Sequence, residues 1–174
     1  MKPSYKAGII TGITVGLFAT TCFSIFNWLN TQFGWGIPPA TIRWLSGLLT
    51  IVIQGTGIYF SMRGNKIAQN GSLTYGQALK AGITVAIMTA LITALFGFIY
   101  CTVVNPGYAD YMVGEANKAM VASGKSAKQI TDELVSVRRE FSTGGQVMEA
   151  LIAQTVVGTV ISLIMSLFTK SKKS

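Results

Sequence analysis

The sequence contains no histidine and very little charge of either sign. Only 11% of its residues are charged and half are hydrophobic, and the mean hydropathy is +0.50. A soluble domain carries about 25% charged residues. No nucleophile–base pair, phosphate-binding glycine loop or metal-ligand spacing occurs either. We therefore expect a chain that avoids water over most of its length, without enzymatic activity and without a cofactor.

Cysteine is almost as scarce. Cys22 and Cys101 lie in apolar segments, so they indicate no disulfide framework and no metal site. Lys2 and Lys6, followed by an apolar run, imitate a signal peptide. Because that uncharged run continues far past signal-peptide length, we interpret it as an uncleaved first helix.

Four long segments contain no charge, and each can hold the roughly 20 apolar residues that cross a bilayer as a helix. Helices are favoured there because a water-free bilayer core requires every backbone amide to be paired within its own segment. A soluble bundle of buried helices is the alternative, but four unbroken uncharged segments disfavour it. The predicted fold is an all-α membrane protein with spans at about 7–30, 44–62, 81–104 and 150–169. We expect 1–174 to be a single four-helix domain, with 105–149 inserted between the last two spans.

Acidic residues are confined to one segment, since all six lie between Asp110 and Glu149. Four spans place both termini on one side, and that side then holds eight cations and no acid. Because Lys and Arg in short loops mark the cytoplasmic side, we expect both termini to be cytoplasmic. The eight cations are Lys2, Lys6, Arg63, Lys66, Lys80, Lys170, Lys172 and Lys173.

The segment between the last two spans, about 108–142, is predicted to form an amphipathic helical hairpin on the extracytoplasmic side. Ser126 followed by Gln129 is a capping-box pattern that starts its second helix. We expect 143–145 (Thr-Gly-Gly) to end that helix before the last span. The apolar seam of the hairpin could face itself, the lipid headgroups or a partner.

Small residues recur every four positions on three of the spans. Such stripes let helix backbones approach closely in lipid. They indicate either packing of the four helices within the chain or a face for a homo-oligomer or membrane-protein partner. The residues concerned are Gly8, Gly12 and Gly16, then Gly82, Ala86 and Ala90, then Gly158 and Ser162. The repeated KAGI at 6–9 and 80–83 also suggests two parallel helical hairpins.

Gln54 and Gln154 are the most polar residues deep in the spans. Counted from Arg63 and Lys170, they differ in depth by roughly 10 Å, so we expect each to bond a neighbouring helix rather than the other. The alternative is that they line a path for a solute. The cations Arg63, Lys66, Lys170, Lys172 and Lys173 could contact anionic phospholipid headgroups, although topology anchoring is the simpler interpretation. Since these charges lie within reach of the bilayer, nucleic-acid binding is not expected.

Two short stretches, SLTYGQALKAG at 72–82 and FIYCTVVNPGY at 98–108, resemble the "domain of unknown function 4199" (DUF4199) membrane proteins of Bacteroidota. The resemblance implies a Gram-negative inner membrane and supplies no activity. Physically, 75–77 suggests a turn into the third span and 105–107 its stop, because proline cannot continue a helix. The matching positions include Tyr75, Gly76, Gln77, Lys80, Asn105 and Pro106.

The sequence thus favours a non-catalytic inner-membrane protein. We expect an accessory or assembly subunit that holds a partner through a small-residue stripe or the hairpin. The alternative is a small translocator of a lipid-linked sugar or another amphipathic solute, which would require a polar cavity open to one side.

Overall fold

The computed structural model describes residues 2–171, of which almost all are helical. No strand occurs within that range, so the predicted all-α class is confirmed. The elements are α1 (Pro3–Phe33), α2 (Pro39–Ala68), α3 (Tyr75–Ile99), the π-helical turn η1 (Tyr100–Val104), α4 (Tyr108–Ala122), α5 (Ala127–Phe141) and α6 (Thr143–Thr169).

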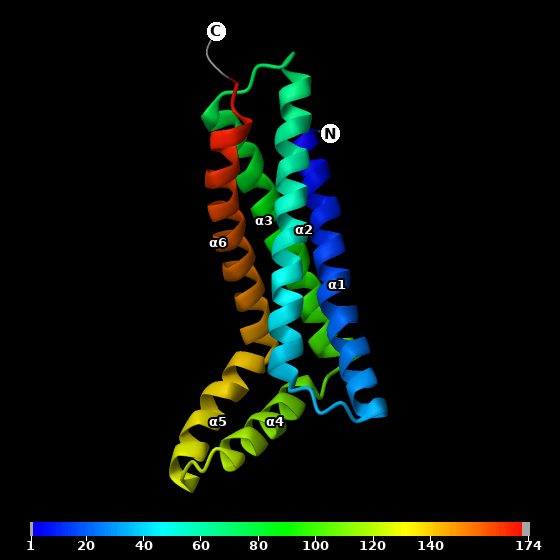
Figure 1. Ribbon diagram of the computed structural model, residues 1–174, viewed down its shortest axis with the longest axis vertical. Coiled ribbons are helices and arrows are strands. Elements are labelled where there is room, and N and C mark those ends of the chain that lie inside the picture. The colour runs from blue at the N-terminus through cyan, green and yellow to red at the C-terminus, as the bar shows by residue number, and fades with distance from the viewer. Residues whose placement is uncertain (1, 172–174) are drawn as a thin grey trace.

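Four helices are long and apolar enough to cross a membrane, as predicted. They run side by side, with both termini and the α2–α3 loop at one end and the α4–α5 hairpin projecting from the other (Figure 1). We call these the terminal end and the hairpin end. The four segments are Pro3–Asn30, Pro39–Ala68, Tyr75–Val104 and Thr143–Thr169.

Each of these helices extends beyond the predicted span. The predicted limits were set at the nearest charged residues. A helix instead ends where other groups, such as capping side chains, pair its terminal backbone N–H and C=O groups. Thr74 caps α3 by accepting a hydrogen bond from the backbone N–H of Gln77 at 3.3 Å. Ser142 caps α6 in the same way, accepting from the N–H of Gly145 at 3.1 Å. The capping box of Ser126 and Gln129 at the start of α5 is confirmed.

Two predicted turns are wrong. Residues 75–77 form the first turn of α3, and the chain reverses earlier, where Asn70 and Gly71 adopt positive φ angles of 51° and 84°. Residues 143–145 start α6 instead of ending α5, so Ser142 alone separates the two helices. A Cβ at Gly145 would lie 2.3 Å from the carbonyl oxygens of Arg139 and Glu140, which explains why the tight junction contains glycine.

The predicted stop at 105–107 agrees with the structure. The N–H of Asn105 donates to the carbonyl of Tyr100 at 2.7 Å, which closes the wide π turn, and Pro106 then prevents further helical hydrogen bonding. The chain turns there and enters the hairpin through α4.

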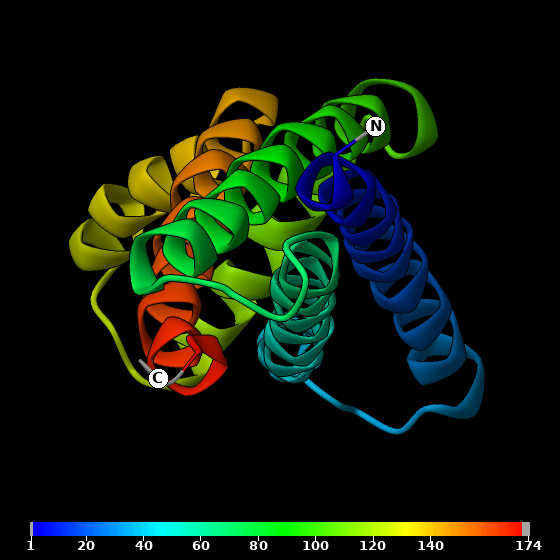
Figure 2. The ribbon, with the colours of Figure 1, turned by 90° about the horizontal axis from the view of Figure 1, so that it is seen from above.

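Helix α3 is the centre of the bundle, because it packs against α1, α2 and α6. Seen along the bundle, α2 and α3 lie between α1 and α6 (Figure 2). The glycine stripe of α1 faces α3: a Cβ at Gly8, Gly12 or Gly16 would lie 2.7, 2.8 or 2.6 Å from an α3 side chain. The contacted side chains, in the same order, are Met88, Ile92 and Phe96. This stripe therefore serves packing within the chain.

The stripes of α3 and α6 face each other. A Cβ at Gly82 would lie 2.3 Å from Ser162 Oγ, and a Cβ at Gly158 would lie 2.5 Å from the Cβ of Ala86. Ala90 continues the same face of α3 and is also buried. All three stripes are thus occupied by helix contacts inside this chain, and none of them is left open for a partner.

Adding one methyl group at the α3–α6 contact should destabilise the bundle. We expect Gly82→Ala to lower the free energy of unfolding by about 1–3 kcal/mol, because overpacking forces the helices apart. Gly47→Ala is the matched control, since a Cβ at Gly47 has nothing within 4 Å. Thermal unfolding of both variants in one detergent checks this, and equal melting temperatures would show that the contact is not tight.

Candidate functional site

A cavity of about 200 Å³ lies between α1, α2, α3 and α6 in the half of the bundle near the hairpin. The cavity exists because small residues of all four helices do not fill this part of the bundle. Aromatic and hydroxyl-bearing side chains also line it. The small residues are Gly16, Ala19, Gly47, Gly97, Ala150 and Ala153. The aromatic and hydroxyl-bearing ones are Thr20, Phe23, Ser46, Thr50, Thr93, Phe96, Tyr100 and Tyr108. A cavity with apolar walls and a few converging polar groups is the usual form of a ligand site.

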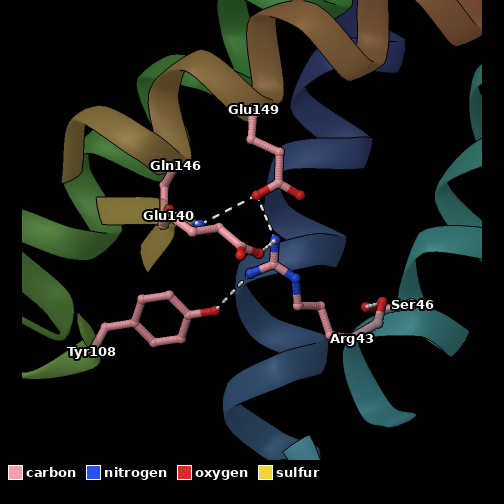
Figure 3. A network of polar contacts seen from close by, with 6 residues as sticks. All are labelled: Arg43, Ser46, Tyr108, Glu140, Gln146 and Glu149. Atoms are coloured by element: carbon pink, nitrogen blue, oxygen red, sulfur yellow. Dashed lines mark hydrogen bonds and ion pairs between the residues drawn. The ribbon is translucent and has the colours of Figure 1, made fainter. Parts of the chain in front are cut away.

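Arg43, near the start of α2, lies at the hairpin end of this cavity, where it contacts residues of three other helices (Figure 3). We call this end of the cavity the rim. Its guanidinium forms an ion pair and a hydrogen bond with Glu149 of α6, and it lies 3.8 Å from a carboxylate oxygen of Glu140 on α5. It also donates to the Tyr108 hydroxyl of α4 at 3.4 Å and lies 4.7 Å from the centre of the Phe141 ring. One side chain of α2 thereby connects both hairpin helices and α6.

Gln146 completes the rim (Figure 3). Its amide nitrogen donates to Glu149 at 3.2 Å and to the backbone carbonyl of Glu140 at 3.1 Å. Glu149 is therefore held from two sides, by a cation and by an amide. Charge-assisted hydrogen bonds of this kind are about twice as strong as neutral ones.

Tyr108 joins the rim to an aromatic cluster. Its ring makes edge-to-face contacts with Phe23, Tyr100 and Phe141, at centroid distances of 5.4, 5.6 and 5.9 Å. Burial raises the pKa of Tyr108 to about 12, although the neighbouring Arg43 opposes the shift. The phenol therefore stays neutral at physiological pH, able to offer a hydroxyl to a ligand but not a charge.

The deep end of the cavity holds one hydroxyl group without a partner. Thr50 and Thr93 line it; the Thr50 hydroxyl donates to the carbonyl of Gly47 at 2.7 Å, whereas the Thr93 Oγ1 makes no hydrogen bond within residues 2–171. The same holds for the Oγ1 of Thr89 and the Oε1 of Gln54, both fully buried. An unpaired buried polar group costs about 1–3 kcal/mol, so each of these three atoms lowers the stability of the bundle unless another molecule pairs it.

Toward the terminal end, this polar region is followed by an apolar cluster. Its members are nearly or fully buried and come from α2, α3 and the loop between them. They are Ile58, Met62, Leu73, Ala78, Ala81 and Val85. The cavity thus lies on one side of this cluster, among which the buried Ser61 donates to the carbonyl of Ala81 at 3.3 Å.

The predicted depths of the two glutamines are wrong. The Gln54 amide nitrogen donates to the backbone carbonyl of Gln154 at 2.9 Å, so these residues lie at a similar depth. The error arose from counting back from Arg63, because α2 continues to Ala68 and it is Lys66 that reaches the end of α6, donating to the Thr169 carbonyl at 3.1 Å. Gln54 does bond a neighbouring helix, as expected, but its acceptor belongs to Gln154, so the expectation that the two glutamines do not bond each other is wrong. Gln154 also lines the cavity.

Other predicted residues lie away from the cavity. The motif residues Tyr75, Gly76, Gln77 and Lys80 form the start of α3 at the terminal end. Arg63, Lys66 and Lys170 lie at the terminal end as well, whereas Lys172 and Lys173 fall outside the described residues. No cluster of residues suited to a metal ion occurs in the described part of the chain.

Sequence reasoning missed Arg43, Glu149, Tyr108 and Thr93 as site residues. A signal for two of them was present. Arg43 is the lone cation between Lys6 and Arg63, and Glu149 is the last acid before the final apolar run. A single charge at the start of each of two spans is typical of an ion pair at a membrane interface. Nothing in the sequence distinguishes Thr93 from the other threonines of the spans.

The chain belongs to the family described as "Protein of unknown function (DUF4199)", whose model matches residues 6–171. This confirms the resemblance that the two short motifs indicated. No curated protein and no solved structure matches the chain.

Removing the charge of Glu149 should loosen the attachment of the hairpin. We expect Glu149→Gln to lower the free energy of unfolding by about 1–3 kcal/mol, because Arg43 loses a charged partner in a half-buried place. Backbone amides of 108–141 should exchange hydrogen faster. Glu115→Gln removes the exposed pair with Lys118 and should cost less than about 1 kcal/mol. Equal effects of the two variants on unfolding and on hydrogen exchange would contradict a special role for Arg43.

Proposed function

We propose that this member of the DUF4199 family is a non-catalytic integral membrane protein that binds the polar head of an amphipathic solute in its cavity, as a small translocator. The observation that carries the proposal is the cavity itself, which ends at the unpartnered hydroxyl of Thr93 and is followed toward the terminal end by a buried apolar cluster. Transporters bind their substrates between packed helices inside the bundle, which is where this cavity lies.

The lining favours a head that is rich in hydroxyl groups. Its hydrogen-bonding groups are mainly neutral threonine, serine, tyrosine and glutamine side chains, which can both donate and accept. The one cation of the lining, Arg43, already forms an ion pair with Glu149, so the cavity has no unpaired charge that could bind a charged head group. The aromatic rings of Phe23, Phe96 and Tyr100 provide flat apolar surface beside these groups. A sugar ring, which has polar edges and an apolar face, fits this combination, and a lipid-linked sugar is therefore the proposed class of solute.

The accessory-subunit hypothesis has less support. It depended on a small-residue stripe or the hairpin being available to a partner, and all three stripes contact helices of the same chain. The hairpin helices α4 and α5 also pack against each other. Tyr111, Val121 and Val135 remain exposed on the hairpin at 36%, 60% and 69%, which is little apolar surface for a lasting partner.

We also propose that the terminal end faces the cytoplasm of a bacterial inner membrane, with the hairpin on the extracytoplasmic side. Within residues 2–171, the basic residues lie at the terminal end, except Arg43 and the basic residues of the hairpin. Every acidic residue lies at the hairpin end. Trp28, Trp35 and Trp44 are exposed near the α1–α2 connection, as interfacial aromatic residues are.

Binding is tested with a fluorescent single-sugar glycolipid and the protein in nanodiscs. We expect saturable binding that Thr93→Val weakens about 2- to 10-fold, because one neutral hydrogen bond is lost. The same variant should unfold at an equal or higher temperature, since it removes an unpartnered buried hydroxyl. Thr84→Val is the matched control, because Thr84 lies on α3 outside the cavity lining and bonds the Lys80 carbonyl at 2.8 Å.

Translocation is read separately, from dithionite quenching of the same glycolipid in proteoliposomes. Faster loss of inner-leaflet fluorescence than in protein-free vesicles supports the translocator. Saturable binding without faster quenching would reject translocation and leave a binding protein, and absence of saturable binding would reject both.

The proposed orientation is tested with single cysteines and a membrane-impermeant maleimide. We expect Ser136→Cys on α5 to be labelled in cells whose outer membrane alone has been permeabilised, and Ser72→Cys in the α2–α3 loop only after lysis. The unaltered chain controls for its own Cys22 and Cys101, of which the first is partly buried and the second buried. The opposite labelling pattern would invert the topology.

A further inference from the structure

A second hollow lies at the terminal end, on the outer surface between α2 and α6. It has a volume of about 410 Å³, and six residues line it: Tyr59, Arg63, Lys66, Met165, Phe168 and Thr169. We call it the terminal groove. None of these residues lines the cavity near the hairpin, so the two are separate sites.

The terminal groove carries two cations and no acid. The Lys66 ammonium is held in place by its hydrogen bond to the Thr169 carbonyl at 3.1 Å. Arg63, one turn earlier on α2, is exposed and has no ion pair within residues 2–171. Since all six acidic residues lie between Asp110 and Glu149, no aspartate or glutamate lies beside these cations within residues 2–171. The charge of the groove is complementary to an anion.

The remaining lining is apolar and faces outward. The Phe168 side chain is 83% exposed and that of Tyr59 is 42% exposed, and Met165 lies one turn before Thr169 on α6. Exposed aromatic surface beside a cation at the end of a spanning helix indicates lipid contact, because the ring can lie along an acyl chain while the cation meets the headgroup. An ion without a lipid tail would leave this apolar surface uncovered.

We propose that the terminal groove binds one anionic phospholipid, with its phosphate between Arg63 and Lys66 and one acyl chain against Tyr59 and Phe168. The site goes beyond the proposed solute cavity and does not depend on it. It also differs from general attraction of basic residues to an anionic surface, because it requires these particular cations and not the others at the same end.

The experiment measures retention of phosphatidylglycerol by the purified full chain in detergent, by native mass spectrometry at increasing lipid concentration. We expect one phosphatidylglycerol to bind more tightly than phosphatidylcholine. Arg63→Gln should weaken that binding about fivefold, which is the contribution of one cation near an anionic headgroup, and Arg63→Lys should retain most of it. Lys66 is left intact, since it also holds the end of α6.

Lys80→Gln is the matched control, because it removes one exposed cation from the same end outside the groove. It should change the affinity less than twofold. Equal losses in Arg63→Gln and Lys80→Gln would reduce the effect to general electrostatics and overturn the site, as would equal binding of the two lipids. Displacement of the lipid by soluble glycerol phosphate at comparable concentrations would show that the acyl chain contributes nothing, and would also overturn it.

Discussion

Close backbone approach around α3 is the constraint on which the rest of the structure depends. In lipid, helices gain little from hiding apolar surface, so they associate through van der Waals packing and interhelical hydrogen bonds. The glycines of α1 fit over Met88, Ile92 and Phe96, and Gly82 and Gly158 admit Ser162 and Ala86. Where this packing is tight, the bundle is solid. Near the hairpin, where a Cβ at Gly47 or Gly97 would meet nothing within 4 Å, a cavity is left.

Charged side chains also differ between the hairpin end and the terminal end of the bundle. At the hairpin end, Arg43 gathers Glu140, Glu149 and Tyr108 from three other helices, so charges inside the bundle rim are paired. At the terminal end, cations such as Arg63 are unpaired and face outward. The two proposed sites reflect this contrast: a neutral hydroxyl-bearing head suits the first, and an anionic headgroup suits the second. The first proposal follows from the pairing of Arg43 with Glu149, and the second from the absence of an acidic partner for Arg63 within residues 2–171.

Some features were accessible from the sequence because they are local. The four spans follow from uncharged run length, the capping box from Ser126 and Gln129, and the stop after the third span from Pro106. The turns at 75–77 and 143–145 were misplaced because Tyr, Gly and Gln or Thr and Gly suit a first helical turn as well as a loop, and only the cap decides between them. The depth of Gln54 was misplaced because a helix end was equated with a charged residue.

The sequence by itself determined that this is a helical protein with four candidate membrane spans and its net positive charge at one end, because run length, polarity and charge position act along the chain and need no knowledge of neighbours. Only the tertiary structure decided which stripe meets which helix, that Gln54 bonds the backbone of Gln154, and that Thr93 is left unpartnered beside a cavity. Those facts depend on the rotation and offset of each helix about its axis, which small differences in side-chain packing set and no local pattern encodes.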